Sequence, residues 1–230
     1  MNHQFGHTYQ DSAVELAAGH RVMRNTYWLL ALSMIPTVLG AWLGVQFNIG
    51  LLVGSSFIGF IAFMAIAFGF FYAIEKTKNS GWGVAVLLGF TFFMGLMLSG
   101  LIGRTLGYSN GAALIMTAFG GTATIMAVMA TVATVSKRDF SGMGRWLFAG
   151  VLVLIVASVA NIFLHLPALY LVVSVLAIGI FSAYILHDVQ QVIRGGETNY
   201  ITATLSIYLD VYNVFANLLS LLGIFGGSRD

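Results

Sequence analysis

The sequence contains no cysteine and very little charge. Only 8% of its 230 residues are charged, whereas 59% are hydrophobic. A soluble domain usually carries about 25% charged residues, so this chain lacks the polar side chains that would cover a water-exposed surface. The absence of cysteine excludes disulfide bonds, thiolate metal sites and cysteine nucleophiles. The shortage of charge predicts a protein whose outer surface contacts lipid, whereas the absence of cysteine leaves the redox compartment open.

Motifs for nucleic-acid binding and for common hydrolases are also missing. No basic patch with interleaved aromatic residues is present, which argues against nucleic acid as a partner. The sequence has no Gly-x-Ser-x-Gly motif, no His-Glu-x-x-His motif and no Walker sequence. Intramembrane aspartyl proteases carry an aspartate in a Gly-x-Gly-Asp sequence, but Asp210 here follows Leu209. We therefore expect a protein that is not an enzyme, has no catalytic residues and needs no cofactor.

Seven hydrophobic segments are long enough to be transmembrane helices. A helix needs about 20 apolar residues to cross the hydrocarbon core, and stretches such as Val151–Val156 lack the alternation expected of a β-barrel strand. Charge-free runs, divided at Asn48 and at His165 and Pro167, predict spans over residues 27–45, 51–74, 81–103, 111–135, 146–164, 168–190 and 200–224. We predict an all-α integral membrane protein with a seven-helix transmembrane domain over residues 27–225. A polar segment, 1–26, precedes this domain and a short tail, 226–230, follows it.

The distribution of basic residues predicts the orientation of the chain. Cytoplasmic segments of membrane proteins carry an excess of lysine and arginine. If the N-terminus is cytoplasmic, two basic residues, Arg104 and Arg229, lie outside, and eight lie inside. The inner set is Arg21, Arg24, Lys76, Lys78, Lys137, Arg138, Arg145 and Arg194. We therefore expect a cytoplasmic N-terminus.

Glycine is abundant, with 27 residues, and some of it is spaced as in helix–helix contacts. Gly40 and Gly44 form a small-xxx-small pair, and so do Gly50 and Gly54. Such pairs let two helix backbones approach closely, although glycine is also common in membrane helices in general.

Two aspartates lie in segments where lipid disfavours charge. Asp188 is near the end of the sixth span, and Asp210 is about ten residues into the seventh, which places it roughly 15 Å deep. A charge at that depth costs about 2.5–3.5 kcal/mol on insertion scales, so Asp210 must be protonated, paired or in contact with water. The two spans are consecutive and joined by a short loop, so we expect them to be antiparallel neighbours. If the carboxyls meet, they share one proton and titrate as a unit.

Such an acid pair predicts a pH-sensitive latch. The singly protonated pair holds two helices together, and the doubly ionised pair repels itself or attracts a hard cation such as calcium, which prefers oxygen ligands. Asp188 and Asp210 are thus the candidate pH-sensing and ion-pathway residues and tentative calcium ligands. His187, Ser206 and Glu75 are possible supporting residues.

Simpler interpretations of the two aspartates remain open. Asp188 can be a solvated acid at the membrane interface beside His187, and Asp210 can be a buried acid bonded to a serine or tyrosine. Asp188 is eight residues before Gly196 and Asp210 fourteen after it, so pairing requires a bend or a shifted helix start. Glu75 precedes Lys76 and Lys78 and is also explained as a solvated loop acid.

The chain resembles the Bax inhibitor-1 family, most closely its bacterial YccA-like branch. The resemblance runs from about His20 to the C-terminus. Its most specific parts are His20–Tyr27, Asn161–Leu169, Gly195–Ile201 and Ser206–Asp210.

This resemblance implies a seven-helix bundle with the last helix central, in the bacterial inner (plasma) membrane. In channel-like members it implies a pH-dependent calcium leak gated by an aspartate pair, and Asp188 and Asp210 match those positions. In the YccA-like branch it implies binding to the membrane protease FtsH and modulation of it. The chain departs from the channel-like pattern at Glu75, where those members have an arginine that bonds the acid pair. The expected partners are therefore the bilayer, calcium ions or protons, and FtsH.

Overall fold

The computed structural model describes residues 3–50 and 57–228, with side chains described from residue 19 onward except for Phe57. Within these residues the chain is almost entirely helical and contains no β-strand. The helices are α1 (His3–Gln46), α3 (Phe57–Thr77), α4 (Gly81–Leu106), α5 (Gly111–Val135), the short η1 (Ser141–Met143), α6 (Gly144–Leu164), α7 (Pro167–Ile193) and α8 (Tyr200–Gly226).

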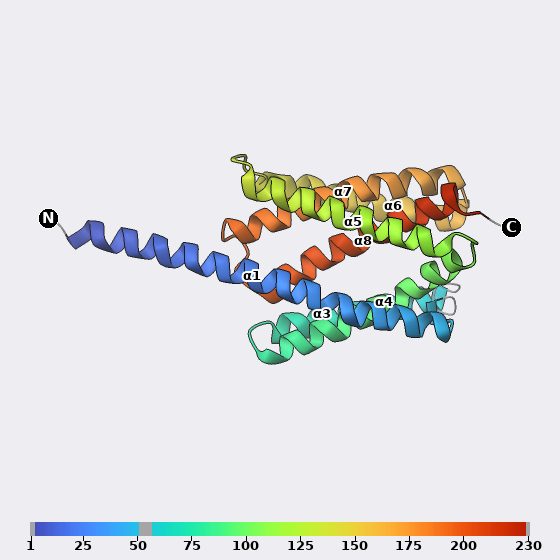
Figure 1. Ribbon diagram of the computed structural model, residues 1–230, viewed down its shortest axis with the longest axis horizontal. Coiled ribbons are helices and arrows are strands. Elements are labelled where there is room, and N and C mark those ends of the chain that lie inside the picture. Colours follow the sequence, from blue (N-terminus) through green and yellow to red (C-terminus); the bar gives the residue numbers. More distant parts are fainter. Residues whose placement is uncertain (1–2, 51–56, 229–230) are drawn as a thin grey trace.

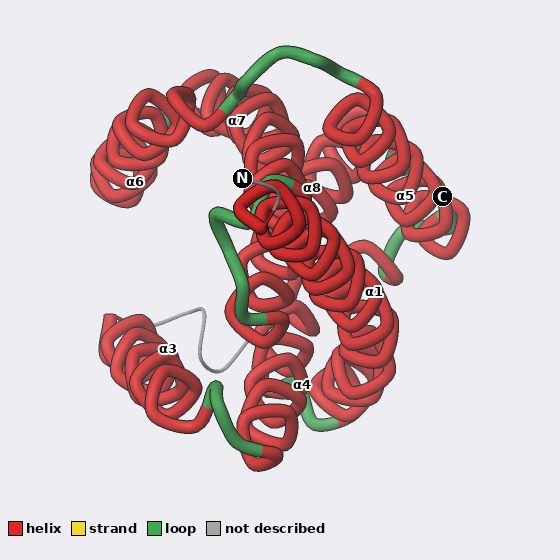
Figure 2. Tube along the Cα trace, turned by 90° about the vertical axis from the view of Figure 1, so that its left-hand side faces the viewer, coloured by secondary structure: helices red, strands yellow, loops and turns green. Residues whose placement is uncertain are grey.

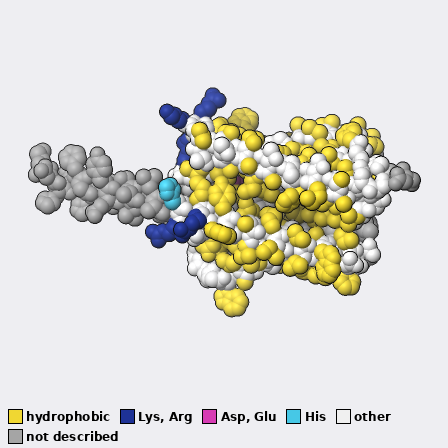
Figure 3. Space-filling view, in the orientation of Figure 1, with side chains coloured by type: hydrophobic (Ala, Val, Ile, Leu, Met, Phe, Trp, Pro, Cys, Tyr) yellow, Lys and Arg dark blue, Asp and Glu magenta, His cyan; other side chains and the backbone are white. Residues whose placement is uncertain are grey.

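Seven of these helices are long and apolar enough to cross a membrane. Large hydrophobic side chains cover the outside of the bundle, among them Trp28, Ile58 and Phe163, each of which is more than two-thirds exposed. Figure 3 shows hydrophobic side chains spread over the face of the bundle. Such a surface is unfavourable in water and suited to lipid. The predicted all-α, seven-span membrane protein is confirmed.

The helix ends differ from the predicted span ends mainly at α1. This helix begins at His3, far before the predicted span start at residue 27, and its membrane-spanning part runs over Gly19–Gln46. The reason is that hydropathy marks where lipid begins, whereas a helix can continue into water with its backbone bonds intact. The predicted start of the second span at residue 51 lies outside the described residues, and α3 is described from Phe57.

Two predicted turns carry left-handed backbone. Asn48, in the turn after α1, has φ of 54°, and His165, between α6 and α7, has φ of 50°. His165 ends α6, and Pro167 starts α7, where its missing N–H leaves no helix bond unmade. His165 is thus a turn residue, as expected.

The last helix occupies the middle of the bundle. Figures 1 and 2 show α8 between a layer of α1, α3 and α4 and a layer of α5, α6 and α7. It packs against α1, α4, α5 and α7, with a smaller contact to α3. Helix α6 contacts only α7 and η1 among the described elements, and α3 contacts only α4 and α8. Helices α3 and α6 therefore do not meet over α8.

Glycine allows α1 and α4 to pack backbone against backbone. A Cβ added at Gly40 would lie 2.2 Å from the carbonyl oxygen of Phe92, and one at Gly95 would lie 2.1 Å from that of Thr37. Gly44 and Ser99 meet in the same interface. The small-residue pair Gly40 and Gly44 thus forms a close helix contact, whereas Gly54 lies outside the described residues.

The basic residues gather at one end of the bundle, which we call the basic end. Its members lie at the start of the membrane-spanning part of α1 and at or next to the ends of α3, α5 and α7 and the start of α6, as Figure 3 shows in part. They are Arg21, Arg24, Lys76, Lys78, Lys137, Arg138, Arg145 and Arg194. Arg104 lies at the opposite end, in the last turn of α4.

Candidate functional site

The two aspartates are brought together by the hairpin of α7 and α8. The connecting loop turns at Gly195, whose φ is 75°, a conformation that favours glycine. Asn199 then caps α8, because its side-chain oxygen accepts hydrogen bonds from the backbone N–H groups of Ile201 and Thr202. The helices leave this loop antiparallel, so Asp188 near the end of α7 and Asp210 in the first half of α8 face the same region.

Asp210 is a buried acid, and one of its two carboxyl oxygens has no hydrogen-bond partner among the described residues. Its side chain is only 5% exposed, and its Oδ2 atom makes no hydrogen bond within the described residues. The carboxyl of Asp188 lies within hydrogen-bonding reach of Asp210 once either acid is protonated. An unpaired buried carboxylate would be very unfavourable, so the arrangement requires a shared proton, water or a cation.

Asp188 is more accessible and has a second neighbour. Its side chain is 19% exposed, and its Oδ1 atom forms a 2.8 Å hydrogen bond with Nδ1 of His187. The other ring nitrogen of His187 lies 3.4 Å from the amide nitrogen of Gln191. His187 therefore links Asp188 to the polar residues at the basic end.

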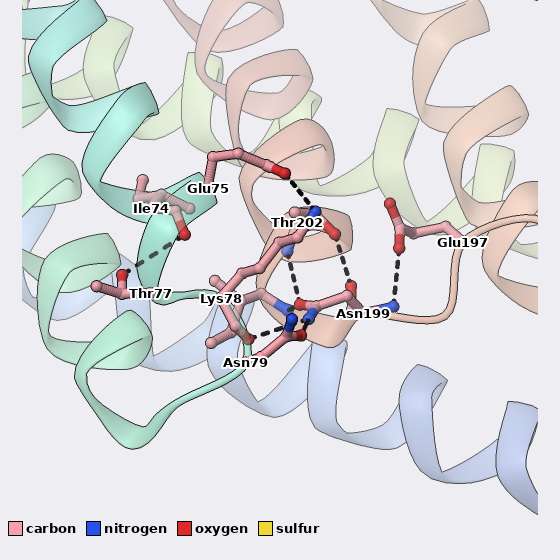
Figure 4. A network of polar contacts seen from close by, with 9 residues as sticks. Ile74, Glu75, Thr77, Lys78, Asn79, Glu197, Asn199 and Thr202 are labelled. Atoms are coloured by element: carbon pink, nitrogen blue, oxygen red, sulfur yellow. Dashed lines mark hydrogen bonds and ion pairs between the residues drawn. The ribbon is translucent and has the colours of Figure 1, made fainter.

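The other two candidate residues lie closer to the basic end than Asp210. Ser206 is exposed, one turn before Asp210 on α8. Glu75 is 64% exposed at the end of α3 and accepts a 2.6 Å hydrogen bond from Lys78. Figure 4 shows this ion pair beside Asn199, which caps α8, and Thr202, which lies in its first turn. The partner of Glu75 is thus a lysine three residues away.

A glutamine that the sequence analysis did not single out holds a loop over this end of the site. Gln190 is 2% exposed, its Oε1 accepts a 2.6 Å bond from the backbone N–H of Phe140, and its Nε2 donates a 2.9 Å bond to the carbonyl of Arg138. Arg194 also donates to that carbonyl and lies 3.4 Å from Asp139. The loop between α5 and η1 is therefore fixed to α7 only two residues from Asp188.

Asp139 stabilises the same loop through a hydrogen bond and a charge interaction. The backbone N–H of Ser141 donates a 2.9 Å hydrogen bond to Asp139. This bond, helped by the Ser141 hydroxyl and by the charge of Arg194, holds the pKa of Asp139 below its usual value. Because this pKa is lowered in the folded protein, ionised Asp139 stabilises the bound loop near neutral pH. This stabilisation is lost as the pH falls below the pKa of Asp139.

Replacing Gln190 with leucine is expected to release this loop. The change leaves the N–H of Phe140 without its partner and leaves the carbonyl of Arg138 with Arg194 alone, and an unmade hydrogen bond of this kind costs about 1–3 kcal/mol where it is shielded from water. Trypsin cleavage after Lys137 or Arg138 in the detergent-solubilised protein, followed by mass spectrometry, should become faster. The same change at Gln191, which contacts His187 instead of the loop, serves as the control. Equal cleavage rates in the wild type and in Gln190→Leu would contradict this role.

Asp188 and Asp210 do not belong to a larger cluster of ligating side chains among the described residues. In the described part of the chain, no group of three or more His, Cys, Asp or Glu side chains is placed to hold a metal ion. Calcium usually takes 6–8 oxygen ligands. A calcium ion held by Asp188 and Asp210 would therefore need other oxygens or water to complete its shell.

The face of α8 turned toward α1 and α4 is closed by tyrosines. The hydroxyl of Tyr208 lies 2.9 Å from that of Thr37, and Tyr208 is 1% exposed with its ring edge against Phe90. The hydroxyl of Tyr212 donates a 3.3 Å bond to the carbonyl of Met94. Any path past Asp210 must therefore follow another face of α8.

Comparison with known proteins agrees with this architecture. The family model described as "Inhibitor of apoptosis-promoting Bax1" matches residues 19–227. The modulator of FtsH protease YccA of Escherichia coli is 37% identical over 94% of this chain and 94% of its own length, and the same bacterial species has a protein named inner membrane protein YccA with the same similarity. An uncharacterized protein of Neisseria meningitidis is 35% identical over 94% of this chain and 96% of its own. An uncharacterized membrane protein of Vibrio cholerae is 34% identical over 89% and 90% of the two chains. Because the family model and these relatives each cover nearly the whole sequence, this chain belongs to the Bax inhibitor-1 family.

Proposed function

We propose that this protein is a pH-sensitive cation leak of the inner membrane, with calcium as the favoured ion. The observation that carries the proposal is the buried, unpartnered Oδ2 atom of Asp210 beside the carboxyl of Asp188. Polar groups that lipid disfavours are usually functional when they occur deep in a transmembrane helix.

The proposed latch works through the charge of the acid pair. With one proton, the two carboxyls form a hydrogen bond that ties α7 to α8. When the pair loses this proton, two negative charges in a low dielectric repel each other and attract a cation. Flux should therefore rise as the pH rises through the range in which the pair ionises.

The experiment is calcium flux into proteoliposomes that contain a trapped calcium indicator, measured over a range of pH. We expect flux above that of empty liposomes, with a clear dependence on pH. A flux equal to that of empty liposomes at every pH would overturn the proposal.

We also propose that the basic end faces the cytoplasm. Eight basic residues belong to this end and only Arg104 among the described residues lies at the opposite one, and positively charged segments are retained on the cytoplasmic side. The N-terminus, from which α1 extends (Figure 1), would then be cytoplasmic.

Modulation of the membrane protease FtsH is the second candidate function. It is supported by the 37% identity to a relative named as a modulator of that protease. A binding function of this kind needs no conduction pathway, so the two functions can be tested separately.

Deleting residues 1–18 is expected to weaken association with FtsH at least severalfold. These residues precede the family match, and from His3 onward α1 extends away from the bundle, where a partner can approach it (Figure 1). The measurement is co-purification of FtsH with tagged protein from native membranes. A chain with Glu75→Gln, which leaves the N-terminus intact, is the control. Undiminished co-purification of the shortened chain would contradict this role of the N-terminus.

A further inference from the structure

Helix α8 carries a row of polar residues that extends well beyond the acid pair. The row is spaced by 4, 4, 3, 4 and 3 residues, which keeps its members on one face of a helix. Its first and last members are 18 residue steps apart, or roughly 27 Å at the helical rise, which is close to the thickness of the hydrocarbon core. Its members are Thr202, Ser206, Asp210, Asn213, Asn217 and Ser220, and we call them the α8 polar row.

The two asparagines of the row are oriented as acceptors. The side-chain nitrogen of Asn213 donates a 2.8 Å bond to the carbonyl of Leu209, and that of Asn217 donates a 2.8 Å bond to the carbonyl of Asn213. Since the amide nitrogen must face the backbone carbonyl, each Oδ1 atom points away from it. Both side chains are half-buried, so these oxygens are available to a ligand.

This geometry differs from that of asparagines that join helices. An asparagine that stabilises a membrane bundle bonds across to a neighbouring helix. Here the donors of both asparagines are used within α8 itself. The row therefore presents amide carbonyl oxygens, the carboxyl of Asp210 and hydroxyl groups. Such oxygen ligands are the type that a hard cation prefers.

The two ends of the row differ in accessibility. Toward the basic end, Ser206 is exposed and Thr202 is half-buried. Helices α3 and α6 make no contact with each other, so they do not close over this part of α8. Toward the opposite end, the hydroxyl of Ser220 is hydrogen-bonded to that of Tyr170 on α7, and Ser220 is 9% exposed. The row is thus open near the basic end and closed by one side-chain contact at the other.

We infer that the α8 polar row is a single hydrated cation lane, in which Asn213 and Asn217 supply the oxygen ligands beyond Asp210 and the contact of Tyr170 with Ser220 closes the far end. This inference rests on the proposed cation leak and adds to it the route of the ion and the ligands along it. The tyrosine-lined face of α8 toward α1 and α4 offers no comparable route, because Tyr208 and Tyr212 fill it.

The absence of cysteine makes hydration of the lane directly measurable. Single cysteines would be placed at Ser206, Asn213 and Asn217 and treated in native membranes with a small, charged, thiol-specific methanethiosulfonate reagent, which reacts with the water-exposed thiolate. The controls are Val153→Cys, on the lipid-exposed surface of α6, and Val214→Cys, fully buried on α8. We expect the three lane cysteines to react at least about tenfold faster than both controls. Reaction no faster than at Val214 would overturn the lane.

Flux measurements then test conduction separately. Asn213→Leu and Asn217→Leu should each lower calcium flux roughly tenfold, the effect of losing one charge-assisted ligand bond. Tyr170→Phe should raise it by removing the contact with Ser220. Leu218→Met, on the side of α8 that packs against Gly121, is the matched control with flux unchanged.

The outcomes separate the two ideas. If the wild-type protein shows no calcium flux although the lane cysteines react with the reagent, the proposed leak is overturned. A conducting wild type with inaccessible lane cysteines and normal flux in both leucine variants overturns the lane and leaves the leak standing.

Discussion

Replacing Asp210 with asparagine is expected to abolish the rise of calcium flux with pH. Asparagine can still hydrogen-bond to Asp188 but cannot ionise, so the pair never carries the two charges that would separate α7 from α8. In the wild type we expect flux to rise about tenfold across this ionisation, which corresponds to about 1.4 kcal/mol of repulsion. In Asp210→Asn flux should stay near its low-pH value at every pH.

The measurement is the calcium flux of both proteins, reconstituted at equal density, from acidic to alkaline pH. Asp139→Asn is the matched control, because it makes the same chemical change in an exposed loop acid that bonds Ser141 and Arg194. It should keep the pH dependence of the wild type. A pH profile in Asp210→Asn that matches the wild type would show that the buried acid does not gate the protein.

Replacing Gly95 with alanine is expected to be strongly destabilising. The added Cβ would lie 2.1 Å from the carbonyl oxygen of Thr37 and 3.0 Å from the backbone nitrogen of Ala41. Both neighbours are backbone atoms, so α1 and α4 must move apart as whole helices. Overpacking costs about 1–3 kcal/mol even where side chains can yield, and here Thr37 would also be drawn away from Tyr208 of the central helix.

Thermal unfolding in mild detergent, followed by size-exclusion chromatography, measures this effect. The midpoint for Gly95→Ala should fall by several degrees, and the yield of folded protein should fall with it. Gly69→Ala is the control, because no atom lies within 4 Å of the added Cβ, and it should match the wild type or gain up to about 1 kcal/mol from helix propensity. Equal midpoints for the two variants would contradict the close packing of α1 on α4.

The membrane fold was predictable because lipid restricts a chain so strongly. Each span needs a long apolar run, and His165 and Pro167 marked the turn within a run long enough for two spans, where Pro167 starts the next helix. The start of α1 was not predictable from hydropathy, since the helix continues beyond the lipid as far as His3. Which glycines pack closely also needed the structure, because Gly40 and Gly69 look alike in sequence and differ only in their neighbours.

The candidate site was predictable at Asp210 and much less so around it. An acid ten residues into an apolar helix is conspicuous by its insertion cost. The hairpin of the last two helices predicted that Asp210 lies near Asp188. The unequal distances of the two residues from the connecting loop argued against a contact. Figure 1 shows α8 crossing the bundle obliquely, so ten residues along this helix lead less deep than along a perpendicular one. The bonds of Gln190 reach a loop about 50 residues earlier, and no local pattern indicates them.

The proposed gating is tested most directly by asking whether the acid pair ionises over the same pH range in which calcium flux rises. Infrared spectroscopy of the reconstituted protein follows the protonated carboxyl signal that disappears as the pH rises, and flux is measured in the same proteoliposomes. We expect one carboxyl signal that is lost in Asp210→Asn and that disappears in the wild type with the same midpoint as the rise in calcium flux. A flux that rises at a different pH from the carboxyl signal, or a signal that persists in Asp210→Asn, would contradict it.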